Sequence, residues 1–576
     1  MTGPHDPSRN SATEFAVELL TEFANLGVND VVVSPGSRSQ ALALAAAALE
    51  RAGTLNLHVH IDERSAGFVA LGLAIESGMP VLIVTTSGSA VANLHPAVLE
   101  AFHSAVPLIL LTADRPGELR GIGANQATHQ VGLFGASTRW VRDVHAPSGD
   151  AVHDGPAPDA GAARTVAREA FSAAAGHSSP AGPVQLNLAF RDPLSDAIGD
   201  LPALAPDPLR ASERAVTRLA AEPRTVVVAG HAAGPEAETA AHSLGAPLIA
   251  EVSSGARFGR NLVVAYRELL ADPDFGGRVR RAIVFGHPTL SREVPALLER
   301  DDVEVIVVRS GGEDFNPGRR VSSFADAIEM TSDASTDPEY REWVGTWVAA
   351  SRAVSAASGV DVNSLGFVPE AVRTDDKAAV AEFARAQLAV FREPVTRERL
   401  VNSVWNATWP HDRLVFAASR LIRDADRTVP GKRISVHSNR GLAGIDGTIA
   451  TATGIARVSQ RIEASSATGV TRVVLGDLAM LHDVGSLLAS PTEPHPRMQL
   501  IVGNDGGGTI FDKLEVAATA ESELFDRVLY TPHDARISAL AEAYGWGYVL
   551  ASNRGELDEA LTASGARTII EVALPR

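Results

Sequence analysis

Short apolar runs alternate with longer alanine-rich stretches along most of this chain, and that alternation limits the possible folds more than any other feature. The runs at 31–33 and 108–111 have the length and composition of buried strands. The stretches between such runs are long enough to form helices. Strands and helices in repeated alternation form βα units, which build parallel sheets covered by helices. We therefore predict an α/β fold.

The alternation occurs in three blocks, which we expect to be three domains. The blocks cover residues 11–197, 212–331 and 394–576, and a helical, charged connector covers residues 332–393. Each block predicts a doubly wound sheet of parallel strands. The predicted strands lie at 31–33, 81–84, 108–111 and 184–186 in the first block, at 225–229, 247–250, 282–285 and 303–308 in the second, and at 414–417, 470–475, 498–502 and 568–572 in the third.

Composition excludes several kinds of site and partner. The 576 residues include no cysteine, so disulfides, thiolate zinc sites and a cysteine nucleophile are excluded. The net charge is −18 and there is no basic tract, which argues against nucleic acid or an anionic membrane as a partner. No apolar run approaches about eighteen residues, and the N-terminus is polar, so we expect no membrane span and a cytoplasmic protein.

Arginine carries almost all of the positive charge, because the lysines are only Lys377, Lys432 and Lys513. None of them stands in the Gly-x-x-x-x-Gly-Lys pattern of a P-loop. Arginine binds carboxylates through two parallel hydrogen bonds. A genome biased towards arginine and alanine codons explains the overall excess, so a role for any individual arginine must be argued from its position.

Two neighbouring strands of the third block end in residues suited to a metal–diphosphate site. The strand at 470–475 is followed by Gly476-Asp477, and the strand at 498–502 is followed by Asn504 and Asp505 with glycines behind them. Magnesium prefers oxygen ligands and shares them with phosphates. Glycines let the backbone approach an anion closely. The sequence therefore predicts a magnesium and diphosphate site at these strand ends.

In open parallel sheets, ligands gather at the carboxyl ends of the strands. Polar and glycine-rich motifs follow the predicted strands of the first and third blocks, and a glutamate, Glu63, precedes an apolar helix at 68–75. The motifs are Ser34-Pro35-Gly36-Ser37-Arg38, Thr86-Ser87-Gly88-Ser89-Ala90-Val91-Ala92-Asn93, Ala113-Asp114-Arg115-Pro116, Ala124-Asn125-Gln126, Ser419-Arg420-Leu421-Ile422-Arg423 and Ser438-Asn439-Arg440-Gly441 with Gly444-Ile445-Asp446-Gly447 behind it.

Taken together, these motifs resemble the 2-succinyl-5-enolpyruvyl-6-hydroxy-3-cyclohexene-1-carboxylate (SEPHCHC) synthase family, also called MenD, of thiamine-diphosphate enzymes. The resemblance covers essentially the whole chain. It implies pyrimidine-binding, central and pyrophosphate-binding domains for the three blocks. It also implies that thiamine diphosphate and Mg²⁺ (or Mn²⁺) are the cofactors. By the resemblance, the catalytic residue is Glu63, and the cofactor-binding residues are Glu63, Ser87, Gly88, Ser419, Asp477, Leu478, Asp505, Ile510 and Phe511.

The resemblance also implies the reaction and its substrates. The family decarboxylates 2-oxoglutarate and adds the resulting succinyl-semialdehyde carbanion to isochorismate, forming SEPHCHC in menaquinone biosynthesis. Both substrates carry two carboxylates, which suits a pocket rich in arginine. The implied assembly is a homo-oligomer, a dimer or a dimer of dimers, with active sites at the dimer interface. The implied substrate-binding residues are Ser37, Arg38, Arg115, Asn125, Gln126, Arg292, Arg423 and Arg440.

The metal ligands can be assigned in two ways. Aligned on Ile510-Phe511, the side-chain ligand beside Asp477 is Asp505, and the carbonyl ligand is that of Gly507. Aligned by distance from Asp477, the ligands are Asn504 and Gly506. We prefer the first assignment, because a gap is easier to place in the preceding loop than inside the turn, and Asn504 stays open as a ligand.

Two other functions remain possible from the sequence. Another thiamine-diphosphate 2-oxoacid decarboxylase or carboligase would share Glu63 and Asp477 but would not need the arginines. A non-catalytic thiamine-diphosphate-binding sensor of metabolites would not need Glu63. An assay for CO₂ release from 2-oxoglutarate, with and without isochorismate, separates these functions.

Overall fold

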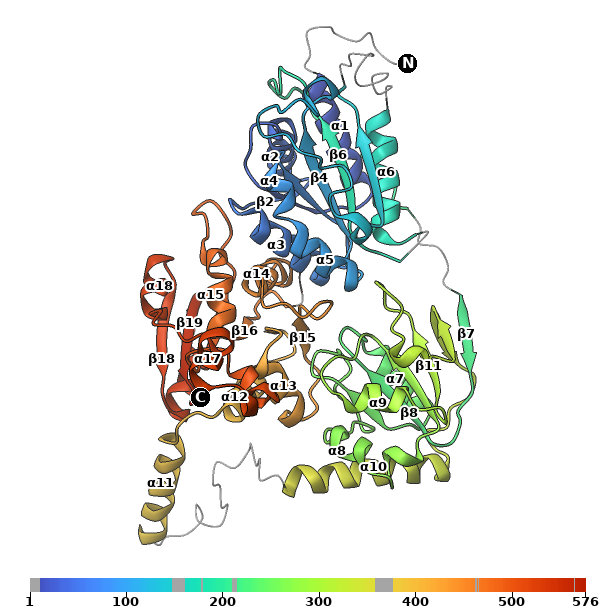
Figure 1. The fold of residues 1–576 in the computed structure, drawn as a ribbon, viewed down its shortest axis with the longest axis vertical. Helices are drawn as coiled ribbons and strands as arrows, with labels where there is room; N and C mark the ends of the chain where they lie inside the picture. Colours follow the sequence, from blue (N-terminus) through green and yellow to red (C-terminus); the bar gives the residue numbers. More distant parts are fainter. Residues whose placement is uncertain are drawn as a thin grey trace.

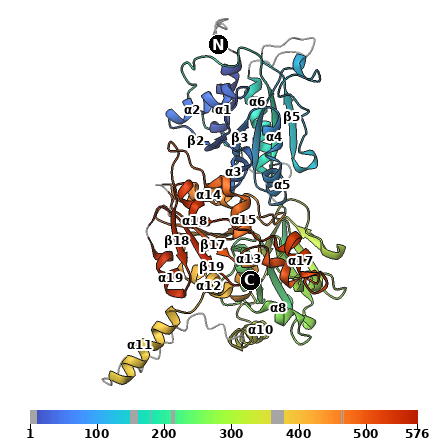
Figure 2. The same cartoon turned by 60° about the vertical axis from the view of Figure 1, so that its left-hand side comes forward.

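The chain folds around three large parallel sheets. The computed structural model describes residues 11–147, 161–177, 180–209, 215–357, 377–461, 464, 466–563 and 565–576. In Figures 1 and 2 the sheets and their helices form three blocks, blue to cyan, green, and orange to red along the chain. Each sheet lies within one of the three predicted blocks, and the predicted α/β class is confirmed. The domain boundaries themselves stay predictions.

The first sheet has six parallel strands in the order β2-β1-β3-β4-β6-β5. Its inner strands are fully buried because helices cover both faces, which is why most of their residues are apolar. Its strands are β1 Asp30–Val33, β2 Asn56–Val59, β3 Val81–Thr85, β4 Leu108–Asp114, β5 Trp140–Val144 and β6 Val184–Ala189; its helices are α1 Ser11–Asn25, α2 Gln40–Arg51, α3 Glu63–Ser77, α4 Ser89–Ala92, α5 His95–His103 and α6 Ala162–Ala175.

The second sheet has five parallel strands in the order β12-β11-β10-β8-β9, and a separate pair, β7 and β13, lies beside it. A long helix, α10, runs beneath this green block in Figure 1, and α11 projects away from all three blocks in both views. The elements are β7 Val216–Leu219, β8 Thr225–Ala229, β9 Leu248–Ala250, β10 Arg281–Phe285, β11 Glu304–Val308, β12 Ser323–Ala325 and β13 Ala327–Met330, with α7 Glu236–Ser243, α8 Tyr266–Ala271, α9 Glu293–Leu298, α10 Pro338–Ala357 and α11 Lys377–Phe391.

The third sheet repeats the architecture of the first, in the order β15-β14-β16-β17-β19-β18. The strands of the predicted metal site, β16 and β17, are adjacent in it, and Gly476 pairs with Gly503. The elements are β14 Arg413–Phe416, β15 Ser435–Ser438, β16 Thr471–Gly476, β17 Met498–Asn504, β18 Gly547–Ala551 and β19 Arg567–Ala573, with α12 Arg397–Ala407, α13 Arg420–Thr428, α14 Thr448–Ser459, α15 Asp477–His482, α16 Val516–Thr519, α17 Ser522–Phe525, α18 Ile537–Ala543 and α19 Arg554–Thr562.

Two glycine-containing helices join the first and third blocks. Helix α3 packs directly on α14, and both are largely buried. A Cβ atom on Gly72 would lie 2.0 Å from the carbonyl oxygen of Thr451, and one on Gly454 would lie 2.2 Å from that of Val69. Only glycine permits so close an approach of two backbones. Because Glu63 is the first residue of α3, this packing also fixes the position of the predicted catalytic carboxylate.

The strands that the sequence did not predict are mostly at sheet edges. Strands β2, β5, β15 and β18 each end a sheet and are less completely buried than the strands inside it. Edge strands carry polar residues on their exposed side, so they lack the continuous apolar run that marks a central parallel strand. Within the described residues, no helix is both long enough and apolar enough to cross a membrane.

Candidate active site

Glu63 stands at the start of α3 with its carboxylate available to a ligand. The Asp62 side chain caps the helix by accepting hydrogen bonds from the backbone N–H groups of Arg64 and Ser65. The Glu63 side chain is half-buried, and its Oε2 accepts a hydrogen bond of 3.1 Å from Asn93 Nδ2. A capped helix end and one amide contact hold the carboxylate without neutralising its charge.

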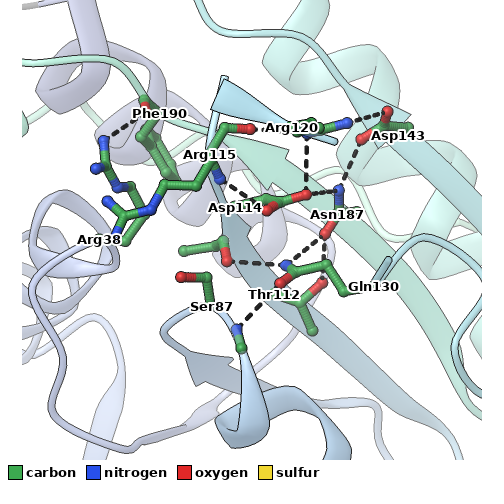
Figure 3. A network of polar contacts seen from close by, with 12 residues as sticks. Arg38, Ser87, Thr112, Asp114, Arg115, Arg120, Gln130, Asp143, Asn187 and Phe190 are labelled. Atoms are coloured by element: carbon green, nitrogen blue, oxygen red, sulfur yellow. Dashed lines mark hydrogen bonds and ion pairs between the residues drawn. The ribbon is translucent and has the colours of Figure 1, made fainter. Parts of the chain in front are cut away.

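Arg38 follows β1 and Arg115 follows β4. In Figure 3 both side chains point to the same side, away from the buried polar residues around Asp114. Arg38 is 6% exposed, and its Nη1 donates to the carbonyl oxygen of Phe190 at 2.9 Å. Its buried Nε has no hydrogen-bond partner within the described part of the chain. Arg115 donates from Nε and Nη2 to the carbonyl oxygen of Asn125. The structure thus brings Arg115 and Asn125 together, as the sequence predicts.

The Ser87-Gly88 turn after β3 is tied to the predicted substrate residue Gln126. The Ser87 hydroxyl donates to the Gln126 carbonyl at 2.9 Å, and Gln126 Nε2 donates back to the Ser87 carbonyl at 3.0 Å. Gly88 has a φ of 84°, a backbone conformation that favours glycine, and its N–H donates to Gln130 Oε1. These bonds fix the turn at the carboxyl end of β3.

A buried polar network lies behind this turn (Figure 3). Gln130, which is 1% exposed, donates to the Ala113 carbonyl and to Asn187 Oδ1. Asn187 in turn donates to Asp114 and Asp143, and both aspartates pair with Arg120. Burial raises the pKa of the Asp114 carboxyl. Because its members are mutually hydrogen-bonded, the network can hold the neighbouring turns rigidly.

Asp477 and Asn504 stand at the same level on neighbouring strands, because Gly476 pairs with Gly503 in the β16–β17 register. Asp477 is 1% exposed; its Oδ1 accepts the Leu478 N–H, and its Oδ2 lies 3.1 Å from His533 Nε2. Burial raises the pKa of this carboxyl, and the nearby Asp505 charge raises it further. Two acidic groups and an amide at one strand edge fit the oxygen donors that a divalent cation prefers.

The environment of Asp505 bears on the metal assignment. Its Oδ2 forms an ion pair of 2.6 Å with Arg397 Nη2 and accepts a hydrogen bond from Thr509 Oγ1. Asn504 has different partners: its Nδ2 donates to Glu571, and its Oδ1 accepts the Gly506 N–H at 3.1 Å and no other donor within the described residues. The arginine already neutralises Asp505. We therefore favour Asn504 as the metal ligand over our sequence-based preference for Asp505.

Arg440 is the most deeply enclosed of the predicted substrate arginines from the third block. It is 2% exposed, and its Nε and Nη2 donate to Thr289 Oγ1 at 3.0 and 2.5 Å. Its buried Nη1 has no hydrogen-bond partner in the part of the chain that is described. Arg423 donates to the Ser419 carbonyl at 2.7 Å, which brings these two predicted residues together. Burial lowers the pKa of both guanidinium groups.

The remaining predicted residues lie around these groups. Arg292 is exposed and precedes α9, three residues after the Thr289 that holds Arg440. Ser37 is exposed beside Arg38, and Leu478 is half-buried in the first turn of α15. Ile510 and Phe511 are half-buried in the short 3-10 helix after the glycine-rich turn, in which Gly506 has a φ of 77° and Gly507 packs against Tyr530.

Apart from Arg292 in the second block, the predicted residues fall into two groups, one on the first block and one on the third. Glu63 and the residues after β1, β3 and β4 form one group, and the residues after β14 to β17 form the other. Among the described residues, no hydrogen bond or ion pair joins the two groups. The sequence did not assign Asn93, Gln130, Arg397 or His533 to the site. Asn93 lies inside a recognised motif, but Arg397 and His533 are far from any motif and are found only through the fold.

Comparisons with known proteins decide the family. Residues 12–133 match the family described as "Thiamine pyrophosphate enzyme, N-terminal TPP binding domain". The chain is 56% identical over 585 residues to the 2-succinyl-5-enolpyruvyl-6-hydroxy-3-cyclohexene-1-carboxylate synthase of Leifsonia xyli subsp. xyli (strain CTCB07), covering 98% of this chain and 97% of that protein. The chain belongs to the SEPHCHC synthase family. The protein of the same name from Clavibacter michiganensis subsp. michiganensis (strain NCPPB 382) is 53% identical over 590 residues, with 98% and 97% covered.

A solved structure supports the fold of this SEPHCHC synthase family member independently. Benzoylformate decarboxylase from Polynucleobacter necessarius aligns with a TM-score of 0.61 over 98% of each chain, at 13% identity. At that identity the likeness concerns the fold alone. The predicted family and the predicted three-sheet architecture are both confirmed.

Proposed function

We propose that this protein is a SEPHCHC synthase, which decarboxylates 2-oxoglutarate and joins the remaining four-carbon unit to isochorismate in menaquinone biosynthesis. Beyond family membership, one observation carries the proposal: deeply buried arginines after the strand ends keep guanidinium nitrogens that have no partner among the described residues. Arg440 Nη1 and Arg38 Nε are such atoms. A buried, charged donor is costly when left unpaired, so its retention favours an anionic ligand as the partner.

The diphosphate and its metal would be held by the third block. Asp477, Asn504 and the backbone carbonyl of Gly506 would bind Mg²⁺ or Mn²⁺, while the glycine turn gives the diphosphate close access to the backbone. His533 would orient Asp477 through the hydrogen bond to Oδ2. The assignment follows the distance from Asp477 and leaves Asp505 to its ion pair with Arg397. We keep Ile510 and Phe511 as the apolar wall against the cofactor.

Glu63 would hold and share a proton at the pyrimidine ring of the cofactor. Thiamine diphosphate, when bound, supplies the electron sink that lets a 2-oxo acid lose carbon dioxide. The carboxylate of Glu63 is half-buried and kept in place by Asn93, so it is oriented for a single hydrogen bond to a ring nitrogen. Ser87 and Gly88, fixed by Gln126 and Gln130, and Ser419 on the other block would line the same cofactor.

The arginines would orient the substrates by their carboxylates. Arg38 and Arg115 would act on one side of the site, and Arg292, Arg423 and Arg440 on the other. Fixed guanidinium groups align a dicarboxylate without using acid–base chemistry, and alignment alone can supply a large part of a rate enhancement. Ser37, Asn125 and Gln126 would add neutral hydrogen bonds beside Arg38 and Arg115.

We also propose that each active site is shared by two subunits of a homo-oligomer. Glu63 and Asp477 belong to different blocks, and among the described residues neither makes a hydrogen bond or ion pair with the other, although Arg64 donates to the His482 carbonyl at the end of α15. A two-fold dimer would let Glu63 of one subunit face Asp477 of another and would form two equivalent sites. A cytoplasmic location stays a prediction.

The proposed function is tested by measuring CO₂ release from 2-oxoglutarate, with and without isochorismate, in wild type and in Glu63→Gln. The amide cannot share a proton as the carboxylate does, so we expect turnover to fall by roughly 10²–10⁴-fold while thiamine diphosphate still binds. Glu50→Gln, on the exposed end of α2, is the matched control and should retain wild-type turnover. Turnover of Glu63→Gln within a few-fold of wild type would remove Glu63 from the mechanism.

A further inference from the structure

A buried carboxylate, Glu251, lies behind the substrate arginines and has no place in the reaction proposed above. It directly follows β9 and is 1% exposed. Its Oε1 accepts two backbone hydrogen bonds, from Thr289 N–H at 2.7 Å and Leu290 N–H at 2.6 Å. Its Oε2 has no hydrogen-bond partner within the described residues. A carboxyl group in such a position needs an explanation, because burying it is costly.

The turn that Glu251 holds is the one that holds Arg440. Thr289 Oγ1 accepts hydrogen bonds from both Nε and Nη2 of Arg440, and the Thr289 carbonyl accepts a third, from Nη2, at 3.1 Å. All three contacts involve Nε and Nη2, and Nη1 has no hydrogen-bond partner in the described parts of the chain. Glu251 therefore controls the orientation of Arg440 through one intervening residue.

The backbone of Arg440 is fixed separately, from the first block. Glu100 on α5 is 4% exposed and accepts hydrogen bonds from the N–H groups of Gly441 at 2.7 Å and Leu442 at 2.9 Å. Glu100 thus holds the main chain next to Arg440. Glu251 holds Thr289, which binds the Arg440 side chain. Glu251 therefore acts on the turn that binds the guanidinium group, and Glu100 acts on the backbone beside it.

We propose that Glu251 is a positioning residue for substrate binding: by holding the Thr289-Leu290 turn, it aims Nη1 of Arg440 at a substrate carboxylate. The inference rests on the proposed function, since it assumes that Arg440 binds a substrate. Arg292 follows the same turn by two residues. Glu251 therefore also helps to fix the position of the Arg292 backbone.

The protonation of Glu251 suggests a conservative replacement. Burial raises the pKa of its carboxyl group to about 8, with a further contribution from the charge of Asp426. The neutral form is therefore favoured near pH 7. Glutamine is neutral and nearly isosteric with that form, and its amide oxygen can accept the same two N–H hydrogen bonds.

The test measures kcat and KM for 2-oxoglutarate and for isochorismate in Glu251→Ala, Glu251→Gln and Thr289→Val. We expect Glu251→Ala and Thr289→Val to raise KM for at least one substrate about tenfold to a hundredfold, which is the effect of losing a hydrogen bond to a charged group. We expect kcat and the affinity for thiamine diphosphate to change less than about threefold, since neither group is among the residues assigned to the cofactor. Glu251→Gln should restore KM to within about threefold of wild type.

Combining the variants tests whether Glu251 and Thr289 act on the same group. If they do, the double variant Glu251→Ala/Thr289→Val has a KM no higher than about that of the worse single variant. The matched control is Glu329→Ala, which removes an exposed carboxylate of the same block from its pair with Arg218 and should leave both KM values unchanged. If Glu251→Ala does not fold, Thr289→Val and Glu251→Gln decide the test.

Three results would overturn the inference: unchanged KM values in folded Glu251→Ala and Thr289→Val, equal damage by Glu251→Gln and Glu251→Ala, or additive losses in the double variant. Failure of the proposed function would appear differently. In that case wild type itself would not release CO₂ from 2-oxoglutarate in an isochorismate-dependent reaction, and no variant would need to be made.

Discussion

Substituting Gly72 by alanine should destabilise the contact between α3 and α14, although alanine is the better helix former. The added Cβ would lie 2.0 Å from the Thr451 carbonyl oxygen and 3.0 Å from the Ile455 nitrogen, whereas ordinary contacts begin at 3.4 Å. The clash is with backbone, so no side-chain rotation can relieve it. The two helices must move apart.

The expected cost follows from two opposing effects. Overpacking a buried contact costs about 1–3 kcal/mol, while replacing a mid-helix glycine by alanine gains about 0.5–1 kcal/mol. Because the clash involves helix backbone on both sides, the cost should lie at the upper end, leaving a net loss of about 2 kcal/mol. For domains of this size, the melting temperature should fall by roughly 4–8 °C.

Gly345→Ala is the matched control for this prediction. Gly345 also lies inside a helix, α10, but a Cβ atom there would meet no atom within 4 Å. Its melting temperature should stay unchanged or rise slightly. A Gly72→Ala protein that melts at or above the wild-type temperature would refute the reasoning. Because α3 begins at Glu63, we also expect Gly72→Ala to lose at least about tenfold in turnover, since small misplacements of catalytic groups are costly.

The remaining predictions concern the metal and the assembly. In titrations of thiamine diphosphate at limiting Mg²⁺, Asn504→Ala should weaken binding by about tenfold or more, and by more than Asp505→Ala does; the reverse order would restore Asp505 as the ligand. Co-expressed Glu63→Ala and Asp477→Ala chains, each inactive alone, should form about half mixed dimers with one intact site each and recover roughly a quarter of wild-type activity. Purified mixed dimers without activity would contradict the shared site.

The fold could be predicted where strands are buried on both faces. Strand β3, with its continuous apolar run at 81–84, was predicted to within one residue, and so was β8. Strand β2 was not predicted, because an edge strand such as Asn56–Val59 alternates polar and apolar residues over too short a span. Sequence patterning identifies strands by their apolar residues, so it misses strands that tertiary hydrogen bonding alone defines.

The local parts of the candidate site could also be predicted. The hydrogen bond of Arg115 to Asn125 joins two motifs that follow β4, and the bond of Gln126 to Ser87 joins motifs that follow the adjacent strands β4 and β3. Strand order in a parallel sheet places such motifs at one edge, so their proximity follows from the pattern. The partners of Arg440 lie in another block, and no spacing in the sequence indicates that Thr289 would reach it.

The metal turn is a place where the sequence offers two ligand assignments and the fold adds an argument for one of them. Asp505 has the more suitable chemistry for a cation, and the sequence alone favoured it. In the folded chain, however, Arg397 comes from the start of α12, more than a hundred residues away, and already provides the positive charge that Asp505 needs. Asn504 carries no charge, but its side-chain oxygen accepts one hydrogen bond from the described part of the chain, from the Gly506 N–H, and retains a lone pair. Whether a carboxylate can serve a metal depends on which cation the fold has already placed beside it, and that information lies in the tertiary structure.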